Sequence, residues 1–403
     1  MEQRSTSSGF PLSGLLALAM TGFIAIMTET LPSGLLPSIS QGLNVSLALA
    51  GQLVTLYALG SMLAAIPLVA LTRSWGRRSA LLAAIIGFFL FNTVTAVSSH
   101  YTLTLVARFL AGAAAGLAWG LLAGCARRMV PPHQQGRAMA IAMVGTPIAL
   151  ALGVPLGAWL GTVVSWRTVF AVISGLTLLL IGWVVLKVPN FPGQKTGEMK
   201  SIVRVLTTPG IRPILSVIVL WILAHNVLYT YIAPFLAPAG ISNQVDSVLL
   251  VFGASALAGI WITGLVVDRW LRRGVLVSVG IFALTSLVLG LAGTSPSVIY
   301  LCMVFWGLTF GGAATLLQTA SADAAGSGAD VAQSMIVVAW NLAIASGGIV
   351  GGILLHSVGV TSFPWILLAL LIVGWIIAWQ SHQYGFKPGT RTESYAVRCE
   401  CEG

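Results

Sequence analysis

Residues 12–36 read LSGLLALAMTGFIAIMTETLPSGLL, an apolar run long enough to cross a lipid bilayer as one helix. Such a crossing takes about 20 apolar residues. Further runs of similar length follow, separated by turn-forming or charged residues. The sequence therefore predicts twelve membrane-spanning helices, over residues 12–36, 48–71, 79–98, 102–125, 136–161, 166–187, 212–236, 246–267, 274–293, 297–320, 330–355 and 362–380.

The composition also indicates a membrane protein. Of the 403 residues, 57% are hydrophobic and 7% are charged, whereas an ordinary soluble domain carries about 25% charged residues. The net charge of +10 would suit a nucleic-acid-binding protein, but the basic residues fall in short loops between apolar runs. We therefore expect an integral membrane protein surrounded by lipid, with no nucleic-acid partner.

No motif in the sequence indicates an enzyme or a bound cofactor. The four cysteines lack metal-site spacing, and PGQKT (192–196) lacks the full phosphate-binding pattern. We therefore expect no catalytic residue, no metal and no cofactor.

The basic residues predict the topology. Of the 20 Lys and Arg residues, only Arg108 and Arg167 lie away from one side of the predicted bundle. Loops rich in Lys and Arg face the cytoplasm, and an even number of spans places both termini on the same side. We expect a multi-pass protein of the cell (inner) membrane with both termini cytoplasmic.

The chain divides at its one long internal polar stretch, VPNFPGQKTGEMKSIVRVLTTPGIRP (188–213), whose Pro and Gly content suits a linker. The halves resemble each other at an offset of 195 residues, since RSWGRR (73–78) aligns with DRWLRR (268–273). We expect an all-α fold of two six-helix bundles related by a pseudo-twofold axis, with a substrate site between them. The expected parts are a cytoplasmic N-terminal tail (1–11), a first bundle (12–187), a cytoplasmic linker (188–211), a second bundle (212–380) and a cytoplasmic C-terminal tail (381–403).

Six stretches together resemble one transporter family. They are TETLPSGLLPSI (28–39), RFLAGAAAG (108–116), GTPIALALGVPLGAWLG (145–161) followed by SWRTVF, AHNVLYTYIAPF (224–235), WGLTFGGAATLLQTA (306–320) and ADVAQSMIVVAWNLAIASGG (329–348). In this order and spacing they resemble the major facilitator superfamily, in its drug:proton antiporter-like branch, and most of all the arabinose and sugar efflux permeases. The resemblance implies the two-bundle fold and proton-driven efflux.

The resemblance also marks the fifth predicted helix as that of an antiporter. Gly145, Gly153, Pro155 and Gly157 resemble the glycine/proline motif of the family's antiporters. A proline inside a membrane helix kinks it, and glycines let a neighbouring backbone approach closely. We expect the kink, and packing of these glycines against the other half, although a purely structural role would also explain them.

The loop LTRSWGRRSALL (71–82) resembles the superfamily's signature loop, usually Gly-x-x-x-Asp-Arg-x-Gly-Arg-Arg, except that Arg73 stands in place of the Asp. The second half keeps that acid as Asp268. The resemblance implies that these loops gate the cytoplasmic face; the simpler alternative is that their bases only anchor the topology. The residues concerned are Arg73, Gly76, Arg77, Arg78, Asp268, Arg269, Arg272 and Arg273.

Glu29 is the only one of the ten acidic residues that falls deep within a predicted span. A charge at the bilayer centre costs roughly 2.5–3.5 kcal/mol on insertion scales. Arg108 lies at a similar depth, roughly 9–10 Å from the surface at 1.5 Å per residue. The resemblance implies a buried arginine that serves proton coupling; the alternative is that Arg108 snorkels to the surface. Since a nearby cation lowers the proton affinity of a buried carboxyl, we expect Glu29 and Arg108 to couple transport to protons.

Uncharged polar residues at membrane depth are the candidates for a substrate cavity. They are His225, Asn226, Tyr229, Gln318 and Asn341, and each could instead bond to a neighbouring helix. Trp119 and Trp306 are weaker candidates, because aromatic residues in helices mostly pack. Sparse charge argues against a strongly charged cargo, since each buried charge would need a partner.

The resulting expectation is a proton-coupled exporter of a small neutral or weakly charged solute, sugar-like, a nucleoside or a drug, that works as a monomer by alternating access. A proton-independent facilitator or an uptake symporter would share the fold. A non-transporting membrane receptor is the alternative from a different class.

Overall fold

The computed structural model describes residues 10–72, 74–131, 138, 141–192, 202–326 and 329–388. Throughout these ranges the regular structure is helical, with no strand. Twelve helical segments within them are long and apolar enough to cross a membrane, from Leu12–Gly34 to Val360–Gln380. The prediction of an all-α membrane fold with twelve spans is confirmed, with boundaries that differ by a few residues.

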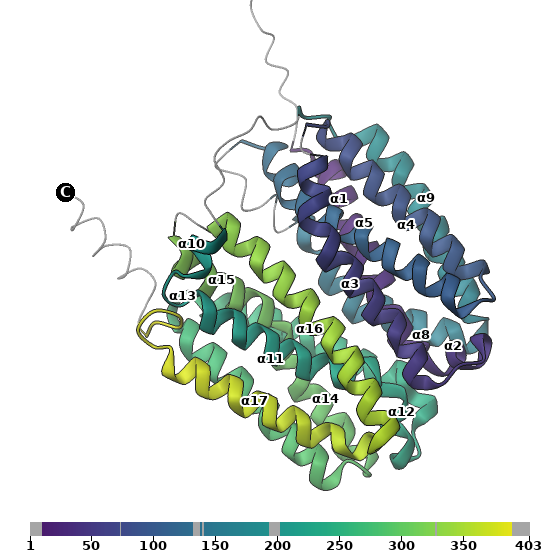
Figure 1. Cartoon of the computed structure of the whole chain (residues 1–403), viewed down its shortest axis with the longest axis vertical. Coiled ribbons are helices and arrows are strands. Elements are labelled where there is room, and N and C mark those ends of the chain that lie inside the picture. The colour runs from purple at the N-terminus through teal and green to yellow at the C-terminus, as the bar shows by residue number, and fades with distance from the viewer. Residues whose placement is uncertain are drawn as a thin grey trace, which may run out of the picture.

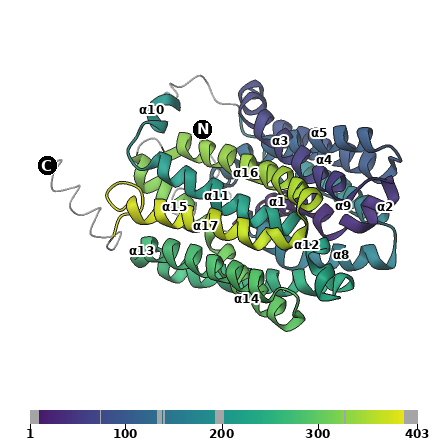
Figure 2. The ribbon, with the colours of Figure 1, turned by 60° about the horizontal axis from the view of Figure 1, so that its bottom comes forward.

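The helices form two bundles that lie side by side, the first purple to blue and the second green to yellow in Figure 1. The first bundle contains α1 (Leu12–Gly34), α2 (Leu36–Leu43), α3 (Leu47–Leu71), α4 (Arg77–Val97), α5 (Tyr101–Arg128), α7 (Gly145–Ile148), η2 (Ala149–Gly153), α8 (Val154–Val163) and α9 (Trp166–Lys187). The second contains α11 (Ile211–Thr230), α12 (Ile232–Leu236), α13 (Val245–Ala292), α14 (Pro296–Gly311), α15 (Ala313–Ala325), α16 (Ala329–Ser357) and α17 (Phe363–Gln380). A short helix, α10 (Ile202–Leu206), precedes α11 at one end of the molecule (Figure 2).

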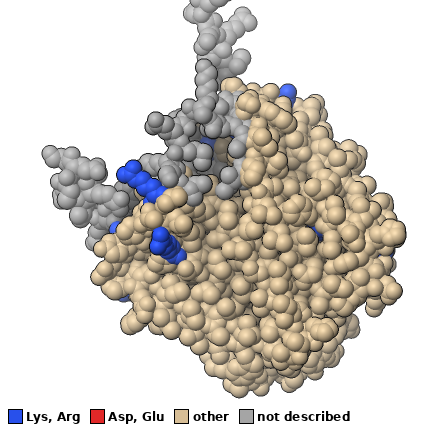
Figure 3. Space-filling model, viewed as in Figure 1, with Lys and Arg blue, Asp and Glu red and all other residues tan. Residues whose placement is uncertain are grey.

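The lateral surface is apolar. Large aliphatic side chains such as Leu179, Leu186 and Leu291 are more than 70% exposed, which would be costly in water but not against lipid tails. Figure 3 shows one face on which the visible Lys and Arg side chains gather mainly beside the α10 end. We call this end of the molecule the basic end.

Proline explains the irregular fifth span. Pro155 has no N–H group, and its ring clashes with the carbonyl of the residue four positions earlier. The chain accommodates it with the π-helical turn η2, immediately before Pro155. Pro155 is therefore accommodated by a widened turn, and the predicted kink of this span stays a prediction.

The glycines of this span pack differently from expectation. A Cβ atom on Gly145 would overlap with the carbonyl oxygen of Ala19, and Cβ atoms on Gly153 and Gly157 would meet Met27 and Leu31. All three neighbours belong to α1 of the same bundle. The expected packing of these glycines against the other half is therefore wrong.

The fifth span meets α13 of the second bundle along η2 and α8. The backbone of Leu150 and Ala151 in this turn lies against Gly253 of α13, where an added Cβ atom would come within 2.5 Å of the Ala151 Cα atom. The widened turn is therefore a point of close backbone contact between the two bundles.

The counterpart of the signature loop in the second half is not an open loop. Residues 268–273 lie inside α13, which holds two membrane spans. The only non-helical backbone angles in α13 are those of Trp270, φ −134° and ψ 36°. The connection between the two spans is thus reduced to a kink.

The bundles meet at the end opposite the basic end through one tyrosine. Tyr231 separates α11 from α12, and its hydroxyl donates to the carbonyl oxygen of Gly348 on α16 at 2.8 Å. It also accepts from Nε2 of Gln52 on α3 at 3.4 Å, and that amide donates to Gly348 as well, at 3.3 Å. These hydrogen bonds tie α3 of one bundle to α11 and α16 of the other, and so hold this end closed.

Replacing Tyr231 with phenylalanine should loosen this end. The ring packing remains, but the hydroxyl bonds are lost, each with a net stabilisation of about 0.5–1.5 kcal/mol. For the two bonds described, about 1–3 kcal/mol in all, we expect the ratio of open to closed molecules to rise roughly five- to 150-fold. Spin labels at exposed Ser46 and Val358, in a chain whose four native cysteines are alanine, should report longer distances by electron paramagnetic resonance.

Tyr300→Phe is the matched control, because the Tyr300 hydroxyl bonds to Gln244 within the second bundle at 2.9 Å. A distance distribution in Tyr231→Phe equal to that of this control would contradict the assignment.

Candidate functional site

Arg108 is fully buried in α5 and does not reach the surface. Its Nε donates to the carbonyl oxygen of Leu53 on α3 at 3.1 Å, and its Nη2 donates to the carbonyl oxygen of Glu29 on α1 at 3.4 Å. Its guanidinium carbon lies 4.8 Å from the centre of the Tyr57 ring. The third nitrogen, Nη1, is buried with no hydrogen-bond partner among the described residues. Arg108 therefore links three helices inside the membrane, and the snorkelling alternative is wrong.

Glu29 lies beside Arg108, but the two side chains form no ion pair. The contact from Arg108 reaches the backbone of Glu29, and the Glu29 carboxylate makes no hydrogen bond or ion pair with any residue that the structure describes. Its charge nevertheless acts on Arg108 and on Tyr57. Glu29 is partly exposed. A carboxyl at this depth that is partly accessible and has no partner in the described ranges is free to take up a proton.

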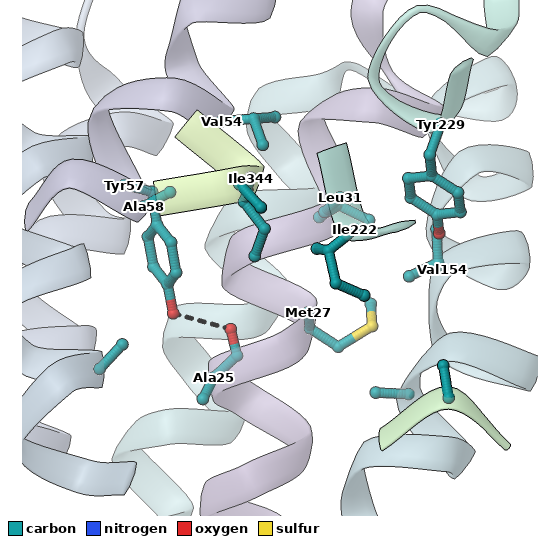
Figure 4. Close-up of a cluster of buried hydrophobic side chains, with 14 of the residues drawn as sticks. Ala25, Met27, Leu31, Val54, Tyr57, Ala58, Val154, Ile222, Tyr229 and Ile344 are labelled. Carbon is teal, nitrogen blue, oxygen red and sulfur yellow. Dashed lines mark hydrogen bonds between the residues drawn. The ribbon is translucent and has the colours of Figure 1, made fainter. Parts of the chain in front are cut away.

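Polar residues next to Glu29 hold its part of α1 in place. The Tyr57 hydroxyl donates to the carbonyl oxygen of Ala25 at 2.9 Å, as Figure 4 shows. The buried amide of Asn92 on α4 donates to the hydroxyl of Thr28 at 2.9 Å, and its own oxygen has no partner in the part of the chain that the structure describes. Tyr57 and Asn92 were not among the site residues predicted from sequence. Asn92 carried the same signal as Asn341, a polar side chain within an apolar run.

An aromatic cluster faces this site from the second bundle. We define it as His225 and Tyr229 of α11, Phe252 of α13, and Trp306 and Phe310 of α14. The His225 ring stacks on Phe310, with centroids 3.5 Å apart and planes 8° apart, and lies 5.0 Å from Tyr229 and 5.2 Å from Trp306. The Phe252 centroid lies 4.5 Å from that of Trp306.

The aromatic cluster reaches the proton site through Tyr229. The charge of Glu29 acts on Tyr229 across the interface between the bundles. Figure 4 draws Tyr229 among the same buried side chains as Met27 and Leu31 of α1 and Val154 of α8. The structure thus brings the predicted residues His225 and Tyr229 together, and of the two it is Tyr229 that lies within electrostatic reach of Glu29.

The other three predicted cavity residues do not join the aromatic cluster. The amide nitrogens of Asn226 and Asn341 donate to carbonyl oxygens in their own helices, of Ile222 and Val337, both at 2.9 Å. Gln318 of α15 is exposed. In the described ranges, no hydrogen bond or ring contact joins these three side chains to the aromatic cluster.

Two arginines of the signature segments bind within their own bundles. Arg78 Nη1 donates to the carbonyl oxygen of Val185 at the end of α9, at 3.2 Å. Arg272 donates to the carbonyl oxygens of Ala378 and Trp379 at the end of α17, at 3.1 and 2.7 Å. Both arginines therefore cap helix C-termini, where a cation is favoured.

The start of α4 is held by the chain that follows α9. Gly76 precedes α4 and lies against Asn190, while the amide of the mostly buried Arg77 donates to the carbonyl oxygen of Phe191 at 2.8 Å. The signature loop of the first half (71–82) therefore contacts the start of the linker that follows its own bundle.

The remaining members of the signature segments are not placed in such contacts. Arg269 and Arg273 are exposed. Arg73 and the side chain of Asp268 lie outside the described residues.

Comparison with known proteins gives one family and several relatives. The sequence pattern of the Major Facilitator Superfamily matches residues 18–335. The purine ribonucleoside efflux pump NepI of Escherichia coli O6:K15:H31 is 29% identical over 357 residues, 87% of this chain and 89% of the pump. A probable sugar efflux transporter of Helicobacter pylori (strain P12) is 26% identical over 373 residues, 91% of this chain and 95% of that protein. Both relatives are named as exporters of small solutes.

The Glu29 carboxyl should react with dicyclohexylcarbodiimide, an apolar reagent that modifies protonated carboxyl groups. We expect Glu29 to be the modified acid in the membrane, with faster modification as the pH is lowered. The adduct is located by mass spectrometry of peptides. It should vanish in Glu29→Gln and persist in Asp246→Asn, which changes an acid in the first turn of α13. Modification of other acids with none at Glu29 would show that this carboxyl is shielded.

Proposed function

Because the chain belongs to the Major Facilitator Superfamily, whose pattern matches most of its length, we propose that it is a proton-coupled exporter of a small neutral or weakly charged solute. Membership of this family and the named relatives make the chain a membrane transporter rather than an enzyme. Proton coupling, direction and substrate are the proposed parts. The candidate substrates are a nucleoside and a sugar, after the names of the relatives, and a weakly charged drug.

One observation carries the proposal: the Glu29 carboxylate has no partner among the described residues, although the buried guanidinium of Arg108 lies next to its backbone. Burial disfavours a charged carboxyl, and a neighbouring cation favours it. A small movement of Arg108 toward or away from the carboxylate would therefore change whether Glu29 holds a proton. An antiporter needs a proton site with this property.

The transport cycle follows from that switch. Glu29 takes a proton when the site faces outward and releases it when the site faces the cytoplasm. The solute then binds the deprotonated, inward-facing form and leaves on the other side. The end closed by Tyr231 would be the outer end, and the basic end the cytoplasmic one.

The proposed organisation places both termini and the linker 188–211 in the cytoplasm of a bacterial cell and the chain in its inner membrane. The bundles 12–187 and 212–380 then rock against each other around the central site. The end-capping contacts of Arg78 and Arg272 would hold α4 to α9 and α13 to α17 during this motion. We propose that the chain acts as a monomer with the proton gradient as its energy source.

Removing the carboxylate should uncouple transport from protons. In proteoliposomes, we expect the wild-type protein to move protons in response to inosine or arabinose, whichever it exports, and Glu29→Gln to move none. Asp246→Asn should behave as wild type. Full coupling in Glu29→Gln would refute the role of Glu29. A proton-independent facilitator would transport the solute equally well in the wild type and in Glu29→Gln, and a receptor would give no flux in any variant.

Transport should tolerate another cation at position 108 better than a neutral residue. Losing one partner of a buried charge network costs about 3–5 kcal/mol, so Arg108→Ala should lose nearly all transport. Arg108→Lys should retain part of it, because an ammonium group can still bond to one carbonyl oxygen. Uptake of labelled inosine or arabinose into the vesicles measures both. Arg212→Ala, at an exposed residue of the basic end, is the control. Undiminished transport in Arg108→Ala would leave Arg108 with a packing role only.

A further inference from the structure

We propose that the aromatic cluster is a binding subsite for a nucleobase, which makes a nucleoside the preferred substrate rather than a sugar. The inference rests on the proposed function as an exporter of a small neutral solute and adds the part of the solute that is recognised. The residues concerned are His225, Tyr229, Trp306 and Phe310, with Phe252 behind them.

The polar edges of the cluster lack partners among the described residues. Nδ1 of His225 and Nε1 of Trp306 are buried without a hydrogen bond. No described residue bonds to the Tyr229 hydroxyl either. Buried polar groups are nearly always paired, so two such buried groups within one ring cluster, with the unbonded Tyr229 hydroxyl beside them, indicate a ligand that bonds to them.

The faces of the cluster fit a flat ring. His225 and Phe310 lie face to face with centroids 3.5 Å apart, which is also how a base stacks on an aromatic side chain. Phe310 is partly exposed and is followed by the break between α14 and α15 at Gly312. The proposal requires Phe310 to move aside so that a base takes its place on His225.

The chemistry of the edges favours a base over other small solutes. Trp306 can only donate, whereas His225 and Tyr229 can each donate or accept. A purine carries ring nitrogens that accept and exocyclic groups that donate or accept, so it can bond to all three while stacking. A sugar has no planar π-system to stack between rings, and a purely lipophilic aromatic ring would leave the polar edges unpaired. Tyr229 then connects the bound base to the neighbourhood of Glu29.

The test compares three ligands on the purified full-length protein: inosine, arabinose and the lipophilic aromatic cation tetraphenylphosphonium. Trp306→Phe and His225→Phe keep a ring and remove one polar edge each. We expect the Kd for inosine to rise at least about tenfold in each variant, the size of one lost buried hydrogen bond.

Trp221→Phe is the matched control. Trp221 is equally buried in α11, its Nε1 also has no partner among the described residues, and no ring contact joins it to the cluster within them. The Kd of Trp221→Phe for inosine should equal that of the wild type.

Three outcomes would overturn the inference. Arabinose could bind where inosine does not, the two variants could bind inosine as tightly as wild type, or tetraphenylphosphonium could compete with the same dependence on Trp306 and His225. Each leaves the proposed export function standing, since that function is tested separately by proton movement in Glu29→Gln.

A measurement on the unmodified chain covers the case in which a variant does not fold. Photoactivated 8-azidoadenosine should crosslink to residues 225–229 or 306–310 of the wild-type protein, and excess inosine should suppress the crosslink. Crosslinks confined to other helices would overturn the inference.

Discussion

A guanidinium inside a membrane needs hydrogen-bond acceptors, and Arg108 finds two of them on neighbouring helices of the first bundle. Its acceptors are backbone carbonyl oxygens of α3 and α1, at Leu53 and Glu29, rather than a carboxylate. Carbonyl oxygens carry partial charge, so they stabilise the cation without neutralising it. The positive charge therefore remains available to the Glu29 side chain, whereas an ion pair with another carboxylate would have neutralised it. Three helices are joined at this point, and the proposed proton site lies among them.

The interface between the bundles joins this site to the second half of the molecule. Tyr231 closes one end by hydrogen bonds to both bundles, whereas the aromatic cluster presents polar edges that no described residue satisfies. The hydroxyl of Tyr231 has its hydrogen-bond partners within the protein and so holds one conformation. The polar edges of the aromatic cluster lack such partners, as expected of a surface that receives a ligand. Tyr231 directly follows α11, the helix that carries His225 and Tyr229, so one helix connects the closing contact to the proposed base subsite.

The span pattern was predictable from sequence because lipid imposes it on every helix alike. Long apolar runs and basic loops predicted twelve spans, and the isolation of Glu29 and the depth of Arg108 predicted that they would be neighbours. The aromatic cluster was only half predictable. His225 and Tyr229 stand out as polar, but Phe252 and Phe310 look like any packing residue until the fold brings them together.

Side-chain partners that depend on helix rotation were not predictable. The glycines of the fifth span were expected to face the other half, and they face α1 on both sides of the π-helical turn, since Gly145 precedes that turn and Gly157 follows it. The connection at Trp270 was expected as a loop, since a charged stretch does not reveal how sharply two spans can join. Asn226 and Asn341 bond to their own helices, a choice that composition alone does not indicate.

The π-helical turn has a mechanical consequence. A wider turn takes in an additional residue, and with it the three motif glycines of the fifth span all lie along α1. Contact along so much of its length leaves α1 little freedom to slide independently, so α1 and the fifth span form one rigid pair. The same turn touches Gly253 of the second bundle. Under the proposed rocking of the bundles, movement at that point would therefore be transmitted to the helix that carries Glu29 and would shift its carboxyl relative to Arg108.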